Sequence, residues 1–381
     1  MNRLAADLGL DVVGAARAEP YVDTEQHIRD RRARGLFADM RFTMARPEVS
    51  CHPERILDGA RTVVAAALCY FADGTEPGPG EVLVALRAAG LNHLDVWVRK
   101  GLPSAPKPRI LGADGAGIVA ALGEGVDGFA VGDRVVVNPG IPHDGRITVI
   151  GEHTDGTYCE LKALPAGQLY PLAESLSFEE GAAFPLTFET AYRMLVTKAA
   201  VRKGEWVLIW GIGGGVALAA FELCRALGAC TIVTSSSRQK LERARELGAD
   251  VAVSHSDDDV VQSVKEATEG RGADIVVETV GEATWERSLA AAAQEGRVVV
   301  CGATSGHSPP ARLYRLWWKQ LVVYGSTMGL PDDFERAYEL VRSGRARVHV
   351  DGVYPLAEAA RAHERLESGA QFGKVVLRIP Q

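Results

Sequence analysis

Apolar residues recur in two different patterns along the second half of the chain. From about residue 201, short continuous apolar runs alternate with stretches in which apolar residues return every three or four positions. The runs predict buried strands over 205–210, 230–234, 251–254, 274–278 and 297–301. The intervening stretches predict helices over 216–227, 238–247, 260–268 and 283–293. Such an alternation is typical of an α/β domain, here a doubly wound parallel sheet with both faces covered.

The segments before and after this α/β region have different patterns of apolar and polar residues. Between 81 and about 161, strand-like runs alternate with glycine-rich turns and predict a compact β-rich domain. The last segment predicts helices over 333–343 and 356–368 and a strand over 375–379, and the first 74 residues predict a charged helix over 25–34 and an apolar run over 62–71. A Pro/Gly breaker, EPGPG at 76–80, marks a joint. We therefore divide the chain into three parts: an N-terminal extension (1–75), a β-rich domain (76–195 and 326–381) and the α/β domain (196–325).

Composition and charge narrow the class of protein. The chain has 381 residues, of which 47% are hydrophobic and 24% charged, as in a globular protein, and no apolar stretch reaches the ~18 residues of a membrane span. We expect no signal peptide, because charged residues interrupt the N-terminus. The net charge of −7 argues against general nucleic-acid or membrane affinity. Six cysteines without a C-x-x-C pair indicate free thiols in a reducing cytoplasm (Cys51, Cys69, Cys159, Cys224, Cys230 and Cys301).

A glycine-rich turn is the strongest chemical signal in the sequence. WGIGGGVA at 210–217 follows a predicted strand directly and precedes a predicted helix. Glycines allow a tight turn and leave room for a pyrophosphate, which would sit at the helix N-terminus, where free N–H groups favour anions. In this strand–turn–helix context the turn predicts dinucleotide binding through Gly211, Gly213, Gly214, Gly215 and Val216.

The end of the next strand indicates which dinucleotide is bound. An NAD site would carry Asp or Glu there for the ribose hydroxyls, whereas this chain has Ser235, Ser236, Arg238 and Lys240. Hydroxyls and cations suit a 2′-phosphate, so we predict NADP(H). The alternative is that the two cations merely decorate a helix start. At the carboxyl ends of later strands, we expect Thr279, Gly302 and Thr304 to line the same crevice.

Several motifs in a consistent order resemble the medium-chain dehydrogenase/reductase superfamily. They are PGPGEVLVALRAAGLNHLDVW, ILGADGAGIVAALGEGVDGFAVGDRVVV, PLTFETAYRML, the glycine turn and the closing FGKVVL, and they span about four-fifths of the chain, from Gly78 to Pro380. The resemblance implies a Rossmann domain beside a GroES-like catalytic domain built from both flanks. It also implies a cofactor held in the cleft between these two domains.

The chain departs from the zinc alcohol dehydrogenases of that superfamily. They place a Cys ligand where this chain has Asn92 and a His ligand where it has Ala113, and they carry a four-cysteine lobe that this chain lacks. With two ligand positions lost we predict no metal. A leftover set, His143, His153 and Cys159, has irregular spacing and is better interpreted as loop residues.

The remaining pattern resembles the zinc-free quinone oxidoreductase branch, which reduces quinones or α,β-unsaturated carbonyls with NADPH. In that chemistry, hydrogen-bond donors must stabilise the negative charge that grows on the substrate oxygen. By position, Asn92 is the best candidate, with His93 and Asp95 beside it, although His93 could equally be a packing residue or a helix cap. PLTFETAY, which contains Thr187, resembles the family segment that touches the nicotinamide, and the resemblance assigns Phe372 and Lys374 to the closing segment near the cofactor.

The N-terminal extension does not fit this superfamily. Residues 8–70 resemble the N-terminal part of epoxyqueuosine reductase, a cobalamin and iron–sulfur enzyme of tRNA modification, but the cysteine-rich cluster segment is absent. The chain thus resembles a junction of two families near 72–76, whether a natural fusion, an engineered joining or an assembly artefact. The run at 63–71 is a candidate to replace an opening strand of the β-rich domain.

Four hypotheses about function follow. The leading one is an NADPH-dependent quinone or enone reductase that uses no zinc. The alternatives are a zinc-type alcohol dehydrogenase with atypical ligands, an NADPH-binding protein without turnover, and a tRNA-modification fragment with an appended reductase. As partners we expect a small-molecule quinone, enone or aldehyde and a second copy of the chain in a homodimer, and neither nucleic acid nor a membrane. The physiological substrate stays open.

Overall fold

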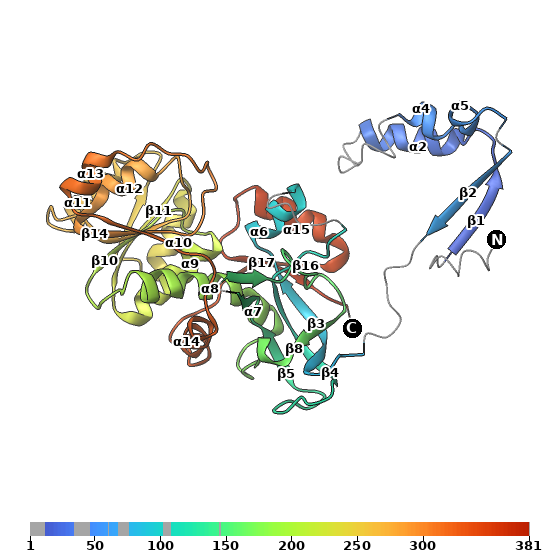
Figure 1. Cartoon of the computed structure of the whole chain (residues 1–381). Helices are drawn as coiled ribbons and strands as arrows, with labels where there is room; N and C mark the ends of the chain where they lie inside the picture. The colour runs from blue at the N-terminus through green and yellow to red at the C-terminus, as the bar shows by residue number, and fades with distance from the viewer. Residues whose placement is uncertain are drawn as a thin grey trace. The chain divides into compact units, whose positions relative to one another are not determined.

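A computed structural model describes residues 12–33, 46–59, 61–67, 76–101, 108–144 and 146–380. The chain divides into two compact units, Met1–Gly74 and Thr75–Gln381, each of which is described by itself (Figure 1). The division falls next to the Pro/Gly-rich joint at 76–80, as a breaker segment with few crossing contacts requires.

The described part of the N-terminal unit contains a two-stranded antiparallel sheet and three helices. Strand β1 (Val12–Arg17) pairs with β2 (Thr62–Ala67) over its whole length, from Val12 opposite Ala67 to Arg17 opposite Thr62. The helices are α2 (Val22–Ala33), α4 (Pro47–Ser50) and α5 (Pro53–Ile56). The expected helix over 25–34 is therefore present, except that residue 34 lies outside the described residues.

The proposed use of the 63–71 run in the catalytic sheet is wrong for its described part. Residues 63–67 belong to β2, which pairs with β1 in an antiparallel ladder. The backbone of β2 is therefore hydrogen-bonded within the N-terminal unit. Residues 68–71 and most of the 72–76 junction lie outside the described residues.

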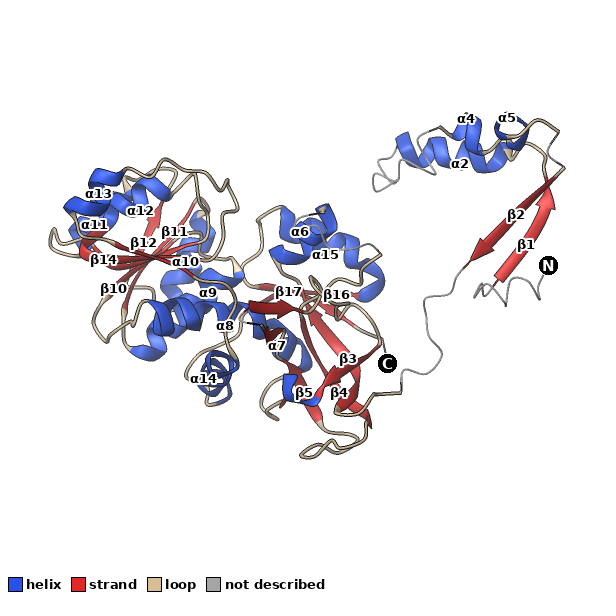
Figure 2. Cartoon of the chain, viewed as in Figure 1, coloured by secondary structure: helices blue, strands red, loops and turns tan. Residues whose placement is uncertain are grey.

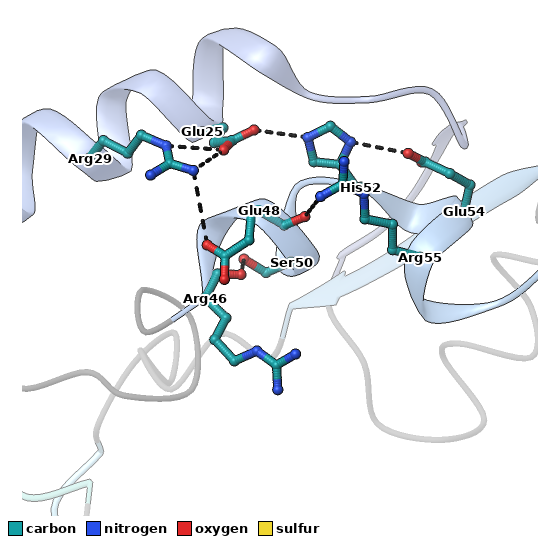
Figure 3. A network of polar contacts seen from close by, with 8 residues as sticks. All are labelled: Glu25, Arg29, Arg46, Glu48, Ser50, His52, Glu54 and Arg55. Carbon is teal, nitrogen blue, oxygen red and sulfur yellow. Dashed lines mark hydrogen bonds and ion pairs between the residues drawn. The ribbon is translucent and has the colours of Figure 1, made fainter.

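A polar network around His52 ties these helices together (Figure 3). The two ring nitrogens face carboxylates: Nε2 lies 2.8 Å from Glu25 Oε2, and Nδ1 lies 3.0 Å from Glu54 Oε1. Arg29 pairs with Glu25 on the same helix and lies 4.0 Å from Glu48 of α4. Hydrogen bonds that the ring donates to Glu25, and to a lesser degree to Glu54, raise the pKa of His52. The network therefore favours a charged imidazolium ring at this position.

The larger unit contains a six-stranded parallel sheet in the order β12-β11-β10-β13-β14-β15. Its strands are continuous apolar runs, as a sheet covered on both faces requires. Figure 2 shows α11, α12 and α13 on one face of this sheet and α9 on the other. The strands are β10 (Trp206–Ile209), β11 (Cys230–Ser235), β12 (Val251–Ser254), β13 (Ala273–Glu278), β14 (Ala292–Val300) and β15 (Val322–Gly325).

The helices of this sheet are close to those predicted. They are α9 (Gly215–Leu227), α10 (Arg238–Glu246), α11 (Val260–Ala267), α12 (Trp285–Ala291) and α13 (Leu313–Trp318). The helix expected over 283–293 ends two residues early, because Ala292 and Ala293 already belong to β14. The predicted doubly wound parallel sheet is confirmed.

A second sheet holds the flanking segments together. Its order is β16-β17-β3-β4-β5-β9, with β8 also paired to β3, and a separate hairpin joins β6 to β7. The strands are β3 (Glu81–Gly90), β4 (Asp114–Leu122), β5 (Arg134–Val137), β6 (Gly140–His143), β7 (Arg146–Val149), β8 (Leu161–Pro165), β9 (Leu169–Pro171), β16 (Val350–Pro355) and β17 (Lys374–Arg378). The antiparallel pairing of β17 with β3 brings the end of the chain beside its first catalytic strand, which is the GroES-like arrangement built from both flanks.

Helices of the flanking segments connect the two sheets. They are α6 (His93–Lys100), α7 (Phe178–Ala183), α8 (Pro185–Tyr192), α14 (Pro331–Arg342) and α15 (Ala359–Glu367), with a π-helical turn at Arg193–Lys198 and 3-10 turns at Ala166–Gln168 and Leu356–Glu358. Helix α8 packs on α9 and α14. Among the described residues, no helix is both long and apolar enough to cross a membrane.

Candidate functional site: a cleft between a glycine turn and a buried ion pair

A cavity of about 670 Å³ lies where the two sheets of the larger unit approach each other. One wall is the end of β10 with the start of α9, and the other is formed by the starts of α6 and β17. Eleven of the residues predicted from the sequence line it: Asn92, His93, Thr187, Gly211, Gly214, Gly215, Val216, Thr279, Gly302, Thr304 and Lys374.

The glycine turn has the geometry of a phosphate-binding loop. Gly211 and Gly213 have φ values of 69° and 114°, which only glycine adopts without strain. A Cβ atom at Gly215 would lie 2.7 Å from Thr187 Cγ2, so the close approach of the two walls also requires glycine. Helix α9 begins at Gly215 and opens its N-terminal N–H groups toward the cavity. The turn and the helix end therefore fit the pyrophosphate of a dinucleotide.

The residues predicted to choose between NADP and NAD lie at the end of β11, beside the cavity lining. Ser235 is buried and its hydroxyl accepts the Ser237 N–H, whereas Ser236 and Arg238 are exposed. The Arg238 guanidinium lies 3.6 Å from the Asp257 carboxylate, and both side chains are open to solvent. Lys240 donates to the Gly369 carbonyl at 2.7 Å. The structure thus brings cations and hydroxyls together here, with one exposed carboxylate beside Arg238.

Three buried polar side chains meet at the opposite wall of the cavity. Lys374 Nζ donates to Asn92 Oδ1 at 2.5 Å and to Asp114 Oδ2 at 2.9 Å. Asn92 Nδ2 also donates to Asp114 Oδ2, at 2.9 Å. Lys374 and Asn92 are each 5% exposed, and Asp114 is 0% exposed. We call this set the Asn92–Asp114–Lys374 cluster.

Asp95 supports this cluster from behind and does not line the cavity. Its carboxylate accepts the Asn92 N–H at 2.7 Å and the Gly112 N–H at 3.0 Å, and the Tyr158 hydroxyl donates to it at 3.1 Å. Burial raises the pKa of Asp95 to about 6, although the Asn92 N–H and the Lys374 charge oppose this shift. Asp95 therefore fixes the backbone at Asn92 and is a positioning residue in this structure.

His93 lies on the cavity wall next to Asn92. Part of the residue is open to solvent, but burial of the ring lowers its pKa, and the nearby Lys374 charge adds to that shift. A neutral imidazole at this place can donate or accept a hydrogen bond toward the cavity.

An apolar lining, which the sequence interpretation largely missed, closes the far end of the cavity. Trp97 lines the cavity, whereas Phe188 belongs to the core and Trp317 is 65% exposed. Further apolar residues of the lining include Leu94, Ile147, Val149, Leu186 and Met328. Their only signal in the sequence was apolar character outside the predicted sheet, and they come from four separate segments.

Phe372 also lies away from the cavity. It is 4% exposed, and the Arg243 guanidinium lies 4.5 Å from its ring. Its neighbour Gly373 donates to the Gly213 carbonyl at 3.0 Å and so ties the closing segment to the glycine turn. The closing segment therefore contacts the cofactor-binding turn through backbone, and the Phe372 ring packs in the core.

The donor set at the cluster does not fit a zinc ion. A zinc site uses Cys, His or carboxylate ligands, whereas here Asn92 stands beside an ammonium group and Ala113 contributes no ligand atom. Within the described ranges, no group of three or more His, Cys, Asp or Glu side chains is arranged to hold a metal. His143 and His153 are exposed, and His153 accepts the Val149 N–H.

Two family profiles match the larger unit. Residues 78–174 match "Alcohol dehydrogenase GroES-like domain" and residues 215–343 match "Zinc-binding dehydrogenase". A quinone oxidoreductase of Pseudomonas aeruginosa is 36% identical over 312 residues, covering 79% of this chain and 92% of that relative. The chain belongs to the medium-chain dehydrogenase/reductase superfamily. Both profile matches lie outside the N-terminal unit, so its resemblance to epoxyqueuosine reductase stays a prediction.

Solved structures agree on the fold, and their descriptions name different nicotinamide cofactors. A structure described as an NAD-dependent alcohol dehydrogenase superposes with a TM-score of 0.78 at 42% identity, covering 83% of this chain and 95% of that chain. The 2-octenoyl-CoA carboxylase reductase CinF, in complex with NADP and 2-octenoyl-CoA, superposes with a TM-score of 0.74 at 29% identity, covering 84% and 82%. The chain is therefore an oxidoreductase of a superfamily whose members use nicotinamide cofactors.

Proposed function

We propose that this protein is an NADPH-dependent reductase of quinones or α,β-unsaturated carbonyls and that it uses no zinc. One observation carries the proposal: a single cavity is lined by the glycine turn, by Asn92 and Lys374 of the Asn92–Asp114–Lys374 cluster, and by apolar side chains. A reduced nicotinamide supplies hydride when it is bound. The apolar walls suit a flat, electron-poor substrate, and the cluster supplies hydrogen-bond donors where negative charge develops.

Most of the predicted residues have a place in this proposal, whereas the Phe372 ring packs in the core. The glycine turn and the α9 N-terminus hold the pyrophosphate, and Thr187, Thr279 and Thr304 line the cavity beside them. Asn92 faces the substrate oxygen, Asp95 orients Asn92, and His93 stands at the cavity wall. The assignment of Ser235, Ser236, Arg238 and Lys240 to the 2′-phosphate of NADPH rests on their charge and hydroxyl groups.

A zinc-type alcohol dehydrogenase is the second candidate, favoured by the 42% identical solved structure described as an NAD-dependent alcohol dehydrogenase. Against it stands the donor set of the cluster, in which the Asn92 amide stands where the resemblance expects a Cys ligand and an ammonium group lies beside it. A non-catalytic NADPH-binding protein is the third. It would bind the cofactor without oxidising it.

We further propose a cytoplasmic homodimer that pairs through the edge of the six-stranded sheet. Strand β15 is that edge, and its Val322 and Val323 are each 42% exposed beside the exposed Trp317 and Trp318 of α13. An unpaired apolar edge is a surface that a second copy can cover. Light scattering at several protein concentrations tests it, and a monomer at all of them contradicts it.

The function is tested by titrating NADPH and NADH and then following NADPH oxidation with a panel of 1,4-quinones and enones. We expect tighter binding of NADPH and turnover with at least one member of the panel. Arg238→Ala should weaken NADPH by about 1–3 kcal/mol and NADH much less, because the charge-assisted contact is lost. Equal losses for both cofactors would refute the phosphate assignment. NADPH binding without turnover on any substrate would favour the non-catalytic protein.

A further inference from the structure

Lys374 is an ammonium group buried in the wall of a cavity, and its partners explain how it remains there. It is 5% exposed, and its two acceptors are Asn92 Oδ1 and Asp114 Oδ2. A buried cation is unfavourable unless it is paired and hydrogen-bonded. The carboxylate of Asp114 supplies the pairing charge, and its other oxygen accepts the Leu186 N–H at 2.9 Å. Both ends of the ion pair are thereby fixed before any substrate arrives.

The stem of Lys374 also defines where the ammonium lies. A Cβ atom at Gly215 would lie 3.3 Å from Lys374 Cδ and 2.7 Å from Thr187 Cγ2. The stem therefore passes directly beside the start of α9, and the ammonium continues to the start of α6, where Asn92 stands. Lys374 therefore lines the same cavity as the glycine turn, on the opposite wall.

Two donors of this cluster are left over. An ammonium has three N–H groups and an amide nitrogen has two, and the hydrogen bonds within the described residues use two on Lys374 and one on Asn92. Both residues line the cavity. We infer that the Lys374 ammonium, together with the free Asn92 N–H, binds the carbonyl oxygen of the substrate and stabilises the charge that forms on it. This inference rests on the proposed function and names the cation that performs the task a metal performs in zinc dehydrogenases.

The reduction of an enone in this site needs one hydride and one proton. Hydride addition to the β-carbon of an enone forms a C–H bond and moves the π electrons of the C=C bond toward the oxygen, which becomes an enolate. Lys374 donates a hydrogen bond to that oxygen and keeps its proton. A proton from water then forms the second C–H bond at the α-carbon, and the carbonyl is restored. The substrate gains two electrons and two hydrogens, and the nicotinamide loses the hydride.

A coloured enal tests the polarisation without any turnover. In 4-(dimethylamino)cinnamaldehyde, a donor on the carbonyl oxygen moves the absorption band to longer wavelength, because it stabilises charge transfer toward that oxygen. We expect this shift when the metal-analysed, chelator-treated protein binds the dye together with NADP⁺. Lys374→Met should abolish the shift, and Lys374→Arg should retain part of it, since Arg keeps the charge with different geometry. NADPH turnover of Lys374→Met should fall by about 10²–10³-fold, the usual effect of losing one oxyanion donor.

The controls separate this inference from its alternatives. Lys374→Met leaves Asp114 buried without a cation, so the double variant K374M/D114N, which removes both charges, is measured beside it with circular dichroism as the folding check. A shift that persists in a folded variant, or a loss confined to NADPH affinity, would overturn the inference while leaving the proposed reductase standing. A wild-type protein that shifts the dye but reduces no quinone or enone would support Lys374 as the polarising group and contradict the proposed function.

Discussion

Two clusters in this chain place a cation between two oxygen acceptors, and they differ in burial. In the larger unit, Lys374 stands between Asn92 and Asp114 with 5% or less of each residue exposed. In the N-terminal unit, His52 stands between Glu25 and Glu54, whose side chains are 14% and 46% exposed. The first cluster lines a cavity, and the second joins short helices.

This difference in burial determines how much stability is lost when one partner of the cluster is removed. A buried ion pair is already desolvated, so removing one partner leaves an uncompensated charge with no water to replace the lost contact. In a partly exposed network, solvent can replace a lost partner, and salt screens the remaining charges. We therefore expect the Asn92–Asp114–Lys374 cluster to respond strongly to single substitutions and the His52 network to respond mainly in its titration.

The largest expected effect comes from Asp114→Asn. This change removes the charge that compensates the Lys374 ammonium and should destabilise the larger unit by about 3–5 kcal/mol. Urea unfolding of the full chain measures it, with K374M/D114N as the matched control. The double variant should recover much of the loss, because neither charge then remains. A single variant as stable as the wild type would show that the cluster is hydrated and would erase the contrast with His52.

A third carboxyl sharpens the comparison, because Glu189 is buried and forms no ion pair with any described residue, although the Arg193 charge lies near enough to act on it. It is 0% exposed, and neither carboxylate oxygen has a hydrogen-bond partner among the described residues, although the Gly329 N–H lies close. Burial first, and then the charges of Asp114 and Asp333, raise its pKa well above the ordinary value.

The raised pKa of Glu189 makes the folded protein less stable as pH rises. The unfolded chain releases the Glu189 proton near pH 4.3, whereas the folded protein keeps it up to the raised pKa. Between these two pH values the free energy of unfolding falls as pH rises, by at most about 1.4 kcal/mol per pH unit. Glu189→Gln should remove this part of the slope and raise stability at neutral pH. Unfolding curves from pH 5 to 8 for both proteins measure the difference. Parallel pH profiles would mean that Glu189 is ionised in the folded state.

The smallest effect is expected at His52. Its raised pKa means that its contribution to stability is complete below about pH 6.5 and is lost as pH rises through the raised value. Glu25→Gln removes the largest cause of the shift and should lower the pKa of His52 in an NMR titration of its ring protons. Glu54→Gln should lower it less. Identical titrations in the wild type and Glu25→Gln would show that the network in Figure 3 does not form in solution.

The sequence predicted the parts of the fold that have a local signal. The strand at 251–254 was predicted to the residue, because a short apolar run between polar residues has one good interpretation. Alanines carry no such signal, so the helix expected to reach 293 gave way to β14 at Ala292. Helix α13 was missed because its large apolar side chains, Trp317 and Trp318 among them, face solvent.

The candidate site was predicted unevenly for the same reason. The glycine turn is contiguous, and its residues could be named directly from the sequence. Lys374 and Asn92 are 282 positions apart, and only the pairing of β17 with β3 brings them together. No spacing in the sequence encodes their hydrogen bond. The resemblance suggested each residue separately, and the structure added the ion pair with Asp114.

The central claim is that an organic cation, and not a metal, supports hydride transfer in this cleft. It is tested most directly by measuring NADPH oxidation with a 1,4-quinone before and after exhaustive chelation, with metal analysis of the same samples. The account predicts equal rates and no stoichiometric zinc in the active protein. A rate that disappears on chelation and returns when zinc is added back would contradict it.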